Sequence, residues 1–326
     1  MVTDSAVELC KKLGKQGVAG FVNAFLRRFS REETEAAIPA GDEGLCIRLS
    51  YPPYAWKMLK AEYGARAEAI AAAKSGGVCV RFERNEEKYL SKKHINAPFP
   101  HMFLFENFAR DESFFEGDYT FQSVGSAAIC DVVEPCGDLL DACAAPGGKS
   151  VLLSKKCGRV TSFELHAHRV ELIRQYKERM GVKNVFEEQK DSSAFHPEYA
   201  GKFDTVLCDV PCSGFGTVSE NPDIKLFRKE EDFRSLKETQ AKILSACSKY
   251  VKEGGTVYYS TCSLFEREND GIVGEFLAEN PDFSAAEIKS PLSNERKKFG
   301  LQFLPDAAFG AGFYVAKLKK KQDGNG

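Results

Sequence analysis

The chain has 326 residues, of which 43% are hydrophobic and 28% are charged. These proportions are typical of a globular protein with room for two or three folded units. The formal net charge is −2, which gives no sign of a strongly basic nucleic-acid-binding protein. We find no apolar run near the ~18 residues that span a bilayer and no signal-peptide pattern, so we expect a cytoplasmic protein without a membrane segment.

Cysteine usage indicates a reducing compartment. The chain has 11 cysteines, an odd number scattered along its length, which does not fit a disulfide framework. No Cys-x-x-Cys pair has a companion Cys or His pair, so we expect no zinc or other metal site. Most of these thiols are expected to be small buried residues, with two exceptions discussed below.

The beginning of the chain predicts a helix followed by a linker. Within residues 1–30, Phe21, Phe25 and Phe29 lie on one stripe at helical spacing. Residues 34–44 are polar and contain one proline and two glycines, which is typical of a linker. Basic residues exceed acidic ones near the N-terminus, and four lysines lie near the C-terminus. These residues fit either ordinary solvated surface or a modest phosphate-binding face.

The rest of the chain predicts two α/β parts. Residues 45–115 predict a small α/β unit, with a helix after Pro53 and a strand at 77–82. From Asp118 onward, strands and helices alternate at βαβ spacing. The expected strands cover residues 138–142, 159–164, 183–188, 203–209, 254–260 and 311–318, with helices near 230–250 and 266–279. This pattern predicts a mainly parallel, doubly wound sheet whose ligands bind at the carboxyl ends of the strands.

The most informative stretch is Asp141-Ala-Cys-Ala-Ala-Pro-Gly-Gly-Lys149, which lies between an expected strand and a helix-like segment at 150–156. Glycines let a ligand approach the backbone, and the helix N-terminus offers free N–H groups. The stretch therefore predicts a nucleotide-type cradle, with an ordinary strand-to-helix turn as the alternative. The lack of a Gly-x-Gly-x-x-Gly sequence in it disfavours a site that grips a dinucleotide pyrophosphate.

Three further motifs follow in order: Asp209-Val-Pro-Cys-Ser-Gly214, Asn221-Pro-Asp-Ile-Lys225 and Tyr259-Ser-Thr-Cys-Ser263. Together with the Gly-Gly turn they resemble the Sun/Nop-type RNA cytosine-5 methyltransferases, the family of bacterial RsmB. The match covers about residues 121–318, and a weaker match begins near Val18. The resemblance implies S-adenosylmethionine as cofactor, RNA as partner and 5-methylcytosine as product. Small-subunit ribosomal RNA is the leading substrate.

The resemblance also implies a division of the chain into four segments. Residues 1–44 would form a helical segment and linker, the remnant of a NusB-like domain that precedes the catalytic part in the family. Residues 45–116 would form an N-terminal RNA-binding subdomain. Residues 117–320 would form a Rossmann-like methyltransferase domain, and residues 321–326 a tail.

The cofactor would be held at the ends of the first three strands of the large sheet. Glu164 ends the second expected strand, where a carboxylate can accept hydrogen bonds from both ribose hydroxyls of an adenosine. Asp191 follows the third strand and matches the family's adenine-side residue. The full set of cofactor-binding residues that the resemblance implies is Cys143, Ala144, Ala145, Pro146, Gly147, Gly148, Lys149, Glu164, Asp191 and Asp209.

The chemistry requires an activated cysteine, because carbon 5 of cytosine is a poor nucleophile until a thiolate adds to carbon 6. Cys212 and Cys262 both follow expected strands, and the thiolate form that attacks must be favoured by their surroundings. By resemblance, Cys262 is the nucleophile and Cys212 assists product release. Asp209 would polarise the cytosine edge, and Lys149 would lie near the substrate. Cys143 and Cys208 are expected to pack in the interior.

Three stretches depart from the family pattern. Arg81-Phe-Glu83 stands where the family has an Arg-x-Asn triplet, and Ser219-Glu-Asn221 replaces two cationic residues. Ala311-Gly-Phe-Tyr314 replaces an Asp-Gly-Phe-Phe sequence. These changes bear on RNA affinity and on the choice of target. Two alternatives stay open: a non-catalytic RNA-binding or ribosome-assembly protein that retains the fold, and a methyltransferase for DNA or a small molecule, which the net charge of −2 allows.

Overall fold

The computed structural model describes residues 2–28 and 37–322, and the chain divides into two compact units, Met1–Trp56 and Lys57–Gly326. The first unit contains α1 (Val2–Lys12), α2 (Gln16–Arg28) and α4 (Gly41–Leu49). The helix predicted near the N-terminus is therefore confirmed for the described residues, as two helices. Phe29 and the beginning of the expected linker lie outside the described residues.

Helix α4 occupies part of the segment expected to be a linker, so that prediction is wrong from Gly41 onward. Gly44 explains the difference. A Cβ atom at this position would lie 1.8 Å from the carbonyl oxygen of Pro39. The glycine therefore permits a close backbone contact in the first turn of a helix, and does not mark a flexible segment.

A small antiparallel sheet follows the helices α5 (Pro53–Tyr63) and α6 (Ala67–Ala72), which the 3-10 turn η1 (Gly64–Arg66) joins. Its strands, in the order β2-β3-β1-β4, are β1 (Val78–Phe82), β2 (His94–Asn96), β3 (Met102–Phe105) and β4 (Tyr119–Phe121). The connections contain η2 (Glu86–Lys88) and α7 (Glu112–Phe115). The helix after Pro53 and the strand at 77–82 are confirmed, and aromatic rings around Phe82 fill the core of this sheet.

The large sheet has nine strands in the order β11-β12-β13-β9-β8-β5-β6-β7, with β10 paired to β13. Its strands are β5 (Cys136–Asp141), β6 (Cys157–Glu164), β7 (Val185–Gln189), β8 (Phe203–Asp209), β9 (Val251–Thr261), β10 (Phe283–Ala286), β11 (Glu295–Arg296), β12 (Gly300–Phe303) and β13 (Phe313–Lys320). The five strands β5 to β9 run parallel, and the other four pair antiparallel. All six expected strands are present, and the predicted α/β fold is confirmed.

Strands β10, β11 and β12 were not expected from the sequence. They contain two to four residues each, which is too short for a clear alternation of apolar and polar side chains. Two of the lysines near the C-terminus belong to a strand and form ion pairs. Lys317 and Lys320 lie in β13, and their ammonium groups pair with Glu134 and Glu253.

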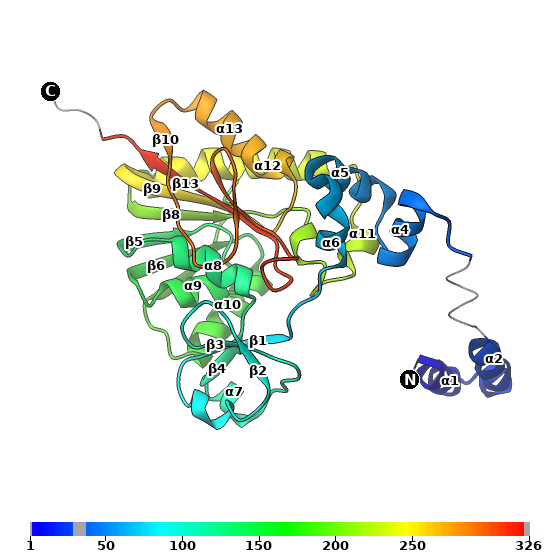
Figure 1. The fold of residues 1–326 in the computed structure, drawn as a ribbon. Helices are drawn as coiled ribbons and strands as arrows, with labels where there is room; N and C mark the ends of the chain where they lie inside the picture. Colours follow the sequence, from blue (N-terminus) through cyan, green and yellow to red (C-terminus); the bar gives the residue numbers. More distant parts are fainter. Residues whose placement is uncertain (1, 29–36, 323–326) are drawn as a thin grey trace. The chain divides into compact units, whose positions relative to one another are not determined.

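Helices cover both faces of the large sheet (Figure 1). Helices α8 (Val124–Val132), α9 (Gly148–Leu153) and α10 (Ala167–Arg179) lie on one face, where Leu139 and Leu207 belong to the hydrophobic core. Helices α12 (Asp232–Cys247) and α13 (Asp270–Glu279) lie on the other face over Leu140 and Val206. The two helices expected near 230–250 and 266–279 are confirmed. This alternation of neighbouring residues between two cores is the signature of a strand buried on both faces.

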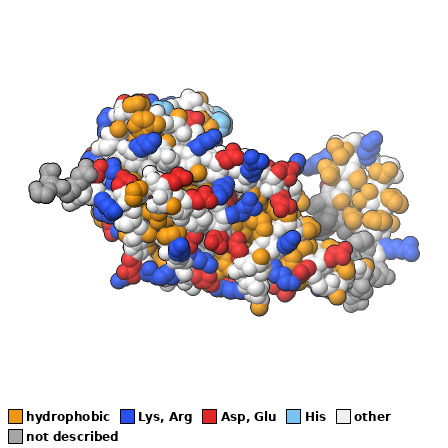
Figure 2. All heavy atoms as spheres, turned by 90° about the horizontal axis from the view of Figure 1, so that it is seen from above, with side chains coloured by type: hydrophobic (Ala, Val, Ile, Leu, Met, Phe, Trp, Pro, Cys, Tyr) orange, Lys and Arg blue, Asp and Glu red, His pale blue; other side chains and the backbone are white. Residues whose placement is uncertain are grey.

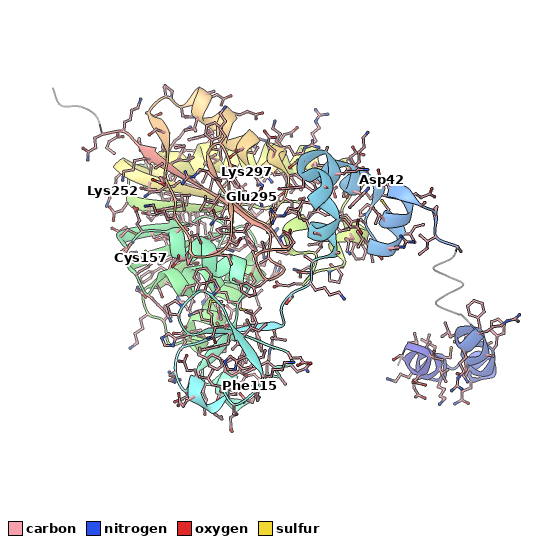
Figure 3. The ribbon with its side chains drawn as sticks, in the orientation of Figure 1. Asp42, Phe115, Cys157, Lys252, Glu295 and Lys297 are labelled. Carbon is pink, nitrogen blue, oxygen red and sulfur yellow. The ribbon has the colours of Figure 1, made fainter. Side chains whose placement is uncertain are left out.

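The amino and carboxyl ends of the parallel strands lie at opposite edges of the sheet. Cys157 and Lys252, labelled in Figure 3, lie at the amino ends of β6 and β9. The motif residues expected to act on a ligand follow the opposite, carboxyl ends. In a doubly wound sheet this carboxyl edge is where ligands bind.

The surface carries mixed charge. On the face shown in Figure 2, Lys and Arg side chains alternate with Asp and Glu, and no single basic area dominates. Among the residues that the structure describes, no helix combines the length and the apolar character needed to cross a bilayer.

Candidate active site

The turn after β5 folds tightly against its neighbouring strands. The Ala142 N–H donates to the Leu207 carbonyl on β8 (2.9 Å), and the Ala144 N–H donates to the Phe163 carbonyl on β6 (3.0 Å). Gly147 has a φ of +105°, and a Cβ atom there would lie 3.2 Å from the Tyr176 ring. A glycine is therefore required at this position for both conformation and space. The predicted strand, Gly-Gly turn and helix are present as β5, residues 142–147 and α9.

A cavity of about 650 Å³ opens at the carboxyl edge of the sheet. The site residues proposed from the sequence that line it are Cys143, Ala145, Glu164, Asp191, Asp209, Cys212 and Cys262. The lining of this cavity does not include the other proposed residues, Ala144, Pro146, Gly147, Gly148 and Lys149. Seven residues from five separate strand ends thus meet in one cavity, which is large enough for a small-molecule ligand.

Two carboxylates mark one part of this cavity. Glu164 is only 4% exposed, and its Oε1 accepts a hydrogen bond from the His166 N–H (3.0 Å). Arg169 lies 3.4 Å from the same carboxylate and also donates to the Ala145 carbonyl (3.2 Å). Asp191 is exposed and accepts hydrogen bonds from the N–H and Oγ of Ser193, which help to lower its pKa. Both carboxylates can accept further hydrogen bonds from ligand hydroxyl or amino groups.

Lys149 and Asp209 form an ion pair at the inner side of the site. Lys149 Nζ lies 2.6 Å from Asp209 Oδ2, and Ser260 Oγ donates to Asp209 Oδ1 at 2.7 Å. Burial favours a lower pKa for Lys149, but the neighbouring Asp209 carboxylate outweighs burial and raises the pKa above its ordinary value. The pair therefore presents a fixed ammonium group and a fixed carboxylate rather than a neutral amine.

Cys212 and Cys262 face each other across the end of the sheet. Their Sγ atoms are 3.0 Å apart, and the Cys262 N–H donates to Cys212 Sγ at 3.2 Å. The hydrogen bond with Cys262 and burial raise the pKa of the Cys212 thiol well above its ordinary value. Cys212 is therefore held as a neutral thiol, while Cys262 is the more exposed of the two.

Sequence reasoning missed a buried carboxylate behind the two cysteines. Glu268 lies in η6 (Glu266–Glu268) and is fully buried. It accepts hydrogen bonds from groups beside both cysteines and from Gln240. In the sequence, Glu268 belongs to the charged run Glu266-Arg-Glu-Asn-Asp270, which resembles a solvated helix start. The one sequence signal for a role at the site is its position, six residues after Cys262.

The first departure from the family pattern is Glu83, whose carboxylate contacts Arg81 and Lys155. Arg81 is 2% exposed, and its guanidinium contacts Glu83 and donates to Gln122 Oε1 at 2.7 Å. Gln122 in turn donates to the Gly148 carbonyl at the start of α9 (3.3 Å). Arg81 thus supports the turn beside the cavity from the small sheet.

The other two departures also have internal partners. Ser219 Oγ donates to the Gly310 carbonyl at 2.7 Å, and Tyr314 Oη donates to Asp270 Oδ1 at 2.5 Å. The first contact joins two loops, and the second ties β13 to the start of α13. These substitutions therefore have a role in the fold itself.

Comparison with known proteins shows which family has this sequence and fold. The family described as 16S rRNA methyltransferase RsmB/F matches residues 133–319. The probable ribosomal RNA small subunit methyltransferase B of Bacillus subtilis is 31% identical over 97% of this chain and 77% of its own length. The chain belongs to the RsmB/F methyltransferase family.

Solved structures agree with this assignment. The crystal structure of PH0851 aligns with 97% of this chain, over 76% of the PH0851 chain, with a TM-score of 0.84. The sequence identity is 22%, so this match supports the fold. NSun6 from Pyrococcus horikoshii, solved with SFG, an analogue of S-adenosylmethionine, is 26% identical. It covers 68% of this chain and 58% of its own, with a TM-score of 0.60. S-adenosylmethionine is the cofactor of this RsmB/F methyltransferase.

The cavity fits that cofactor. Its wall at the turn contains the small residues Ala142, Cys143 and Ala145, which leave room for a ligand against the backbone. Glu164 and Asp191 supply acceptors for the hydroxyl and amino groups of an adenosine, and Asp209 faces the same space. When bound, S-adenosylmethionine would supply an electrophilic methyl group near the two cysteines.

Proposed function

We propose that this chain forms 5-methylcytosine in small-subunit ribosomal RNA through a covalent bond between Cys262 and the target cytosine. The single observation that carries the proposal is the 3.0 Å separation between Cys212 Sγ and Cys262 Sγ, in the cavity that also contains Asp209, Glu164 and Asp191. Methylation at carbon 5 needs a thiol that adds to carbon 6 and a second group that acts when the thiol leaves. The names of the relatives support ribosomal RNA as the substrate.

The two cysteines take different roles in this proposal. The Cys262 thiolate adds to carbon 6, which makes carbon 5 a nucleophile toward the methyl group. Carbon 5 takes the methyl group, and S-adenosylhomocysteine leaves. The proton of carbon 5 then passes to a water molecule that acts as base, and cleavage of the bond between carbon 6 and Sγ restores the aromatic ring and frees the Cys262 thiolate. Cys212, held as a neutral thiol 3.0 Å away, assists this last step. Cys262 is the nucleophile because it is the more exposed of the two.

The ion pair would act on the pyrimidine ring. The Asp209 carboxylate, oriented by Lys149 and Ser260, lines the cavity at the level of the cysteines. It can accept a hydrogen bond from the N4 amino group of a cytosine and so orient the base for addition of the thiolate. A target base must leave its stack to enter this cavity, so we expect a loop or an accessible helix end in the RNA.

The test is to incubate the protein with methyl-labelled S-adenosylmethionine and small-subunit ribosomal RNA, and then to digest the RNA to nucleosides. Label in 5-methylcytidine that is lost with Cys262→Ala is the expected result. DNA of the same sequence and a small-metabolite extract serve as competing substrates. Label in another nucleoside, in DNA or in a metabolite would contradict the proposal. Absence of transfer to any substrate by a protein that binds the cofactor would favour a non-catalytic RNA-binding role.

A further inference from the structure

Glu268 is a buried acidic side chain that lies behind the two cysteine loops. Its side chain is fully buried in η6, six residues after Cys262, and among the residues that the structure describes it forms no ion pair. Acidic side chains are almost never buried to this degree without partners. Its partners are three hydrogen-bond donors, and their positions show what the carboxylate does.

The carboxylate contacts the residue after each cysteine. Glu268 Oε1 accepts from the N–H of Ser213 at 2.8 Å, and Oε2 accepts from Ser263 Oγ at 2.5 Å. Ser213 directly follows Cys212, and Ser263 directly follows Cys262. One carboxylate therefore bridges two loops that lie fifty residues apart in the sequence.

Gln240 on α12 extends this bridge to the other side of Cys212. Its Nε2 donates to Glu268 Oε1 at 3.0 Å and to the Pro211 carbonyl at 2.9 Å. The loop that carries Cys212 is thus held both before and after the cysteine. A carboxylate accepts hydrogen bonds at both oxygens and donates none, which matches three donors converging on it.

The neighbouring Asn269 holds the second loop in a similar way. Its Oδ1 accepts from Thr261 Oγ1 at 2.6 Å, and its Nδ2 donates to the Ser263 carbonyl at 3.2 Å. These contacts fix the backbone on both sides of Cys262. The short segment 268–269 therefore positions both cysteine loops while contributing no residue to the lining of the cavity.

We propose that Glu268 is a positioning residue that sets the separation of Cys212 and Cys262, so that both thiols reach the same pyrimidine ring. This inference rests on the proposed covalent mechanism. Catalysis by two groups that act on one ring is sensitive to displacement, because a misplacement of about 1 Å can slow a reaction on the order of 100-fold. Glu268→Gln replaces the oxygen that accepts from Ser263 Oγ with an amide NH2 group. This group donates hydrogen bonds, so the contact with Ser263 Oγ is lost as it stands.

The separation of the thiols can be measured without RNA or cofactor. Diamide oxidises two neighbouring thiols to a disulfide by accepting two protons and two electrons, which leaves it as the hydrazine. The rate at which the Cys212–Cys262 disulfide forms, followed by peptide mass spectrometry, reports how often the two Sγ atoms meet. We expect Glu268→Gln to slow this rate by about tenfold or more, with a similar loss in kcat and an unchanged Kd for S-adenosylmethionine.

The matched control is Glu62→Gln. The Glu62 carboxylate accepts from the Glu266 N–H at 3.0 Å, so it contacts the same 3-10 turn without contacting the residue after either cysteine. Its disulfide rate and kcat should equal those of the wild type. Should Glu268→Gln fail to fold, Ser263→Ala removes one arm of the bridge and leaves the carboxylate in place.

The inference would be overturned if the disulfide in Glu268→Gln formed at the wild-type rate. If only Ser263→Ala folds, a wild-type rate in that variant would overturn it. An equal slowing in Glu62→Gln would overturn it as well, because the effect would then not depend on the bridge. The disulfide measurement is independent of methyl transfer. If the wild type forms the disulfide rapidly but does not methylate cytosine, the proposed function fails while the role of Glu268 in holding the loops stands.

Discussion

Cys212 Sγ and Cys262 Sγ lie 3.0 Å apart although the residues belong to loops after two different strands, β8 and β9. These strands are parallel neighbours, with Asp209 opposite Ser260 in the register. Parallel pairing brings both carboxyl ends to one edge, so each loop places its cysteine against the other. The distance follows from the sheet and from the hydrogen bonds that tie the loops together.

The first prediction separates the roles of these two thiols. Cys212→Ala should leave Cys262 able to add to carbon 6, so the RNA should remain covalently attached because release is impaired. A denaturing gel should show a protein–RNA species for Cys212→Ala that disappears in the double variant Cys212→Ala/Cys262→Ala. Cys262→Ala alone should form no adduct. An adduct in Cys262→Ala would instead mean that Cys212 attacks the base.

A second prediction concerns the partly buried ion pair, whose side chains are 15% (Lys149) and 21% (Asp209) exposed. Asp209→Asn leaves the Lys149 ammonium without its carboxylate, and the loss of a hydrogen bond between charged groups costs about 1.5–3 kcal/mol. Urea denaturation should show this loss of unfolding free energy, and the double variant Lys149→Met/Asp209→Asn should recover part of it. Glu238→Gln breaks an exposed pair with Arg234 and should change stability by less than about 1 kcal/mol. Equal effects of Asp209→Asn and Glu238→Gln would contradict the partly buried character of the pair.

Part of this site follows directly from sequence patterns. The alternation of strands and helices at βαβ spacing predicts strands β5, β6, β8 and β9, and it places the residues after them at one edge of the sheet because parallel strands end together. Cys212 and Cys262 were therefore located before their separation was known. The sequence alone did not show that these two thiols would be close enough to hydrogen-bond.

The support behind the site could not be predicted, because it depends on burial. Glu268 lies in a run of charges whose pattern indicates a solvated helix start, and Arg81 lies in the segment that the resemblance assigns to an RNA-binding subdomain. In the fold both are buried, and each has a hydrogen-bond partner from a distant segment, Ser213 for Glu268 and Gln122 for Arg81. The local pattern of apolar and polar residues predicts helices and strands from their periodicity. It does not predict contacts between residues that lie tens of positions apart. Strands β10 to β12 were missed for a simpler reason, their length.

The third prediction is a pH dependence that involves Asp141. Burial raises the pKa of this carboxyl to about 6, against the hydrogen bond from Ser150 Oγ. Because the unfolded value is about 3.9, the folded protein holds more protons than the unfolded chain between about pH 4 and pH 6. The contribution of Asp141 to the free energy of unfolding therefore falls as pH rises through that window.

Asp141→Asn removes this titration and keeps an acceptor for Ser150. The unfolding free energy of the variant minus that of the wild type should rise by about 2 kcal/mol between pH 4 and pH 8. Urea denaturation at several pH values measures this difference. Ser150→Ala removes the hydrogen bond that lowers the pKa, and it should move the window to higher pH. A difference between Asp141→Asn and wild type that does not change with pH would contradict the burial of a titrating carboxyl.

The last prediction concerns cofactor binding by Glu164. This carboxylate is 4% exposed and lines the cavity, where it can accept hydrogen bonds from both ribose hydroxyls of S-adenosylmethionine. Hydrogen bonds to a charged group contribute roughly 1.5–3 kcal/mol, so Glu164→Ala should raise the Kd by about ten- to a hundredfold in calorimetry. Glu171→Ala is the control, because Glu171 is an exposed carboxylate on α10 that pairs with Arg174 outside the cavity. If a folded Glu164→Ala variant binds the cofactor as tightly as Glu171→Ala, the ribose contact is not made by this residue.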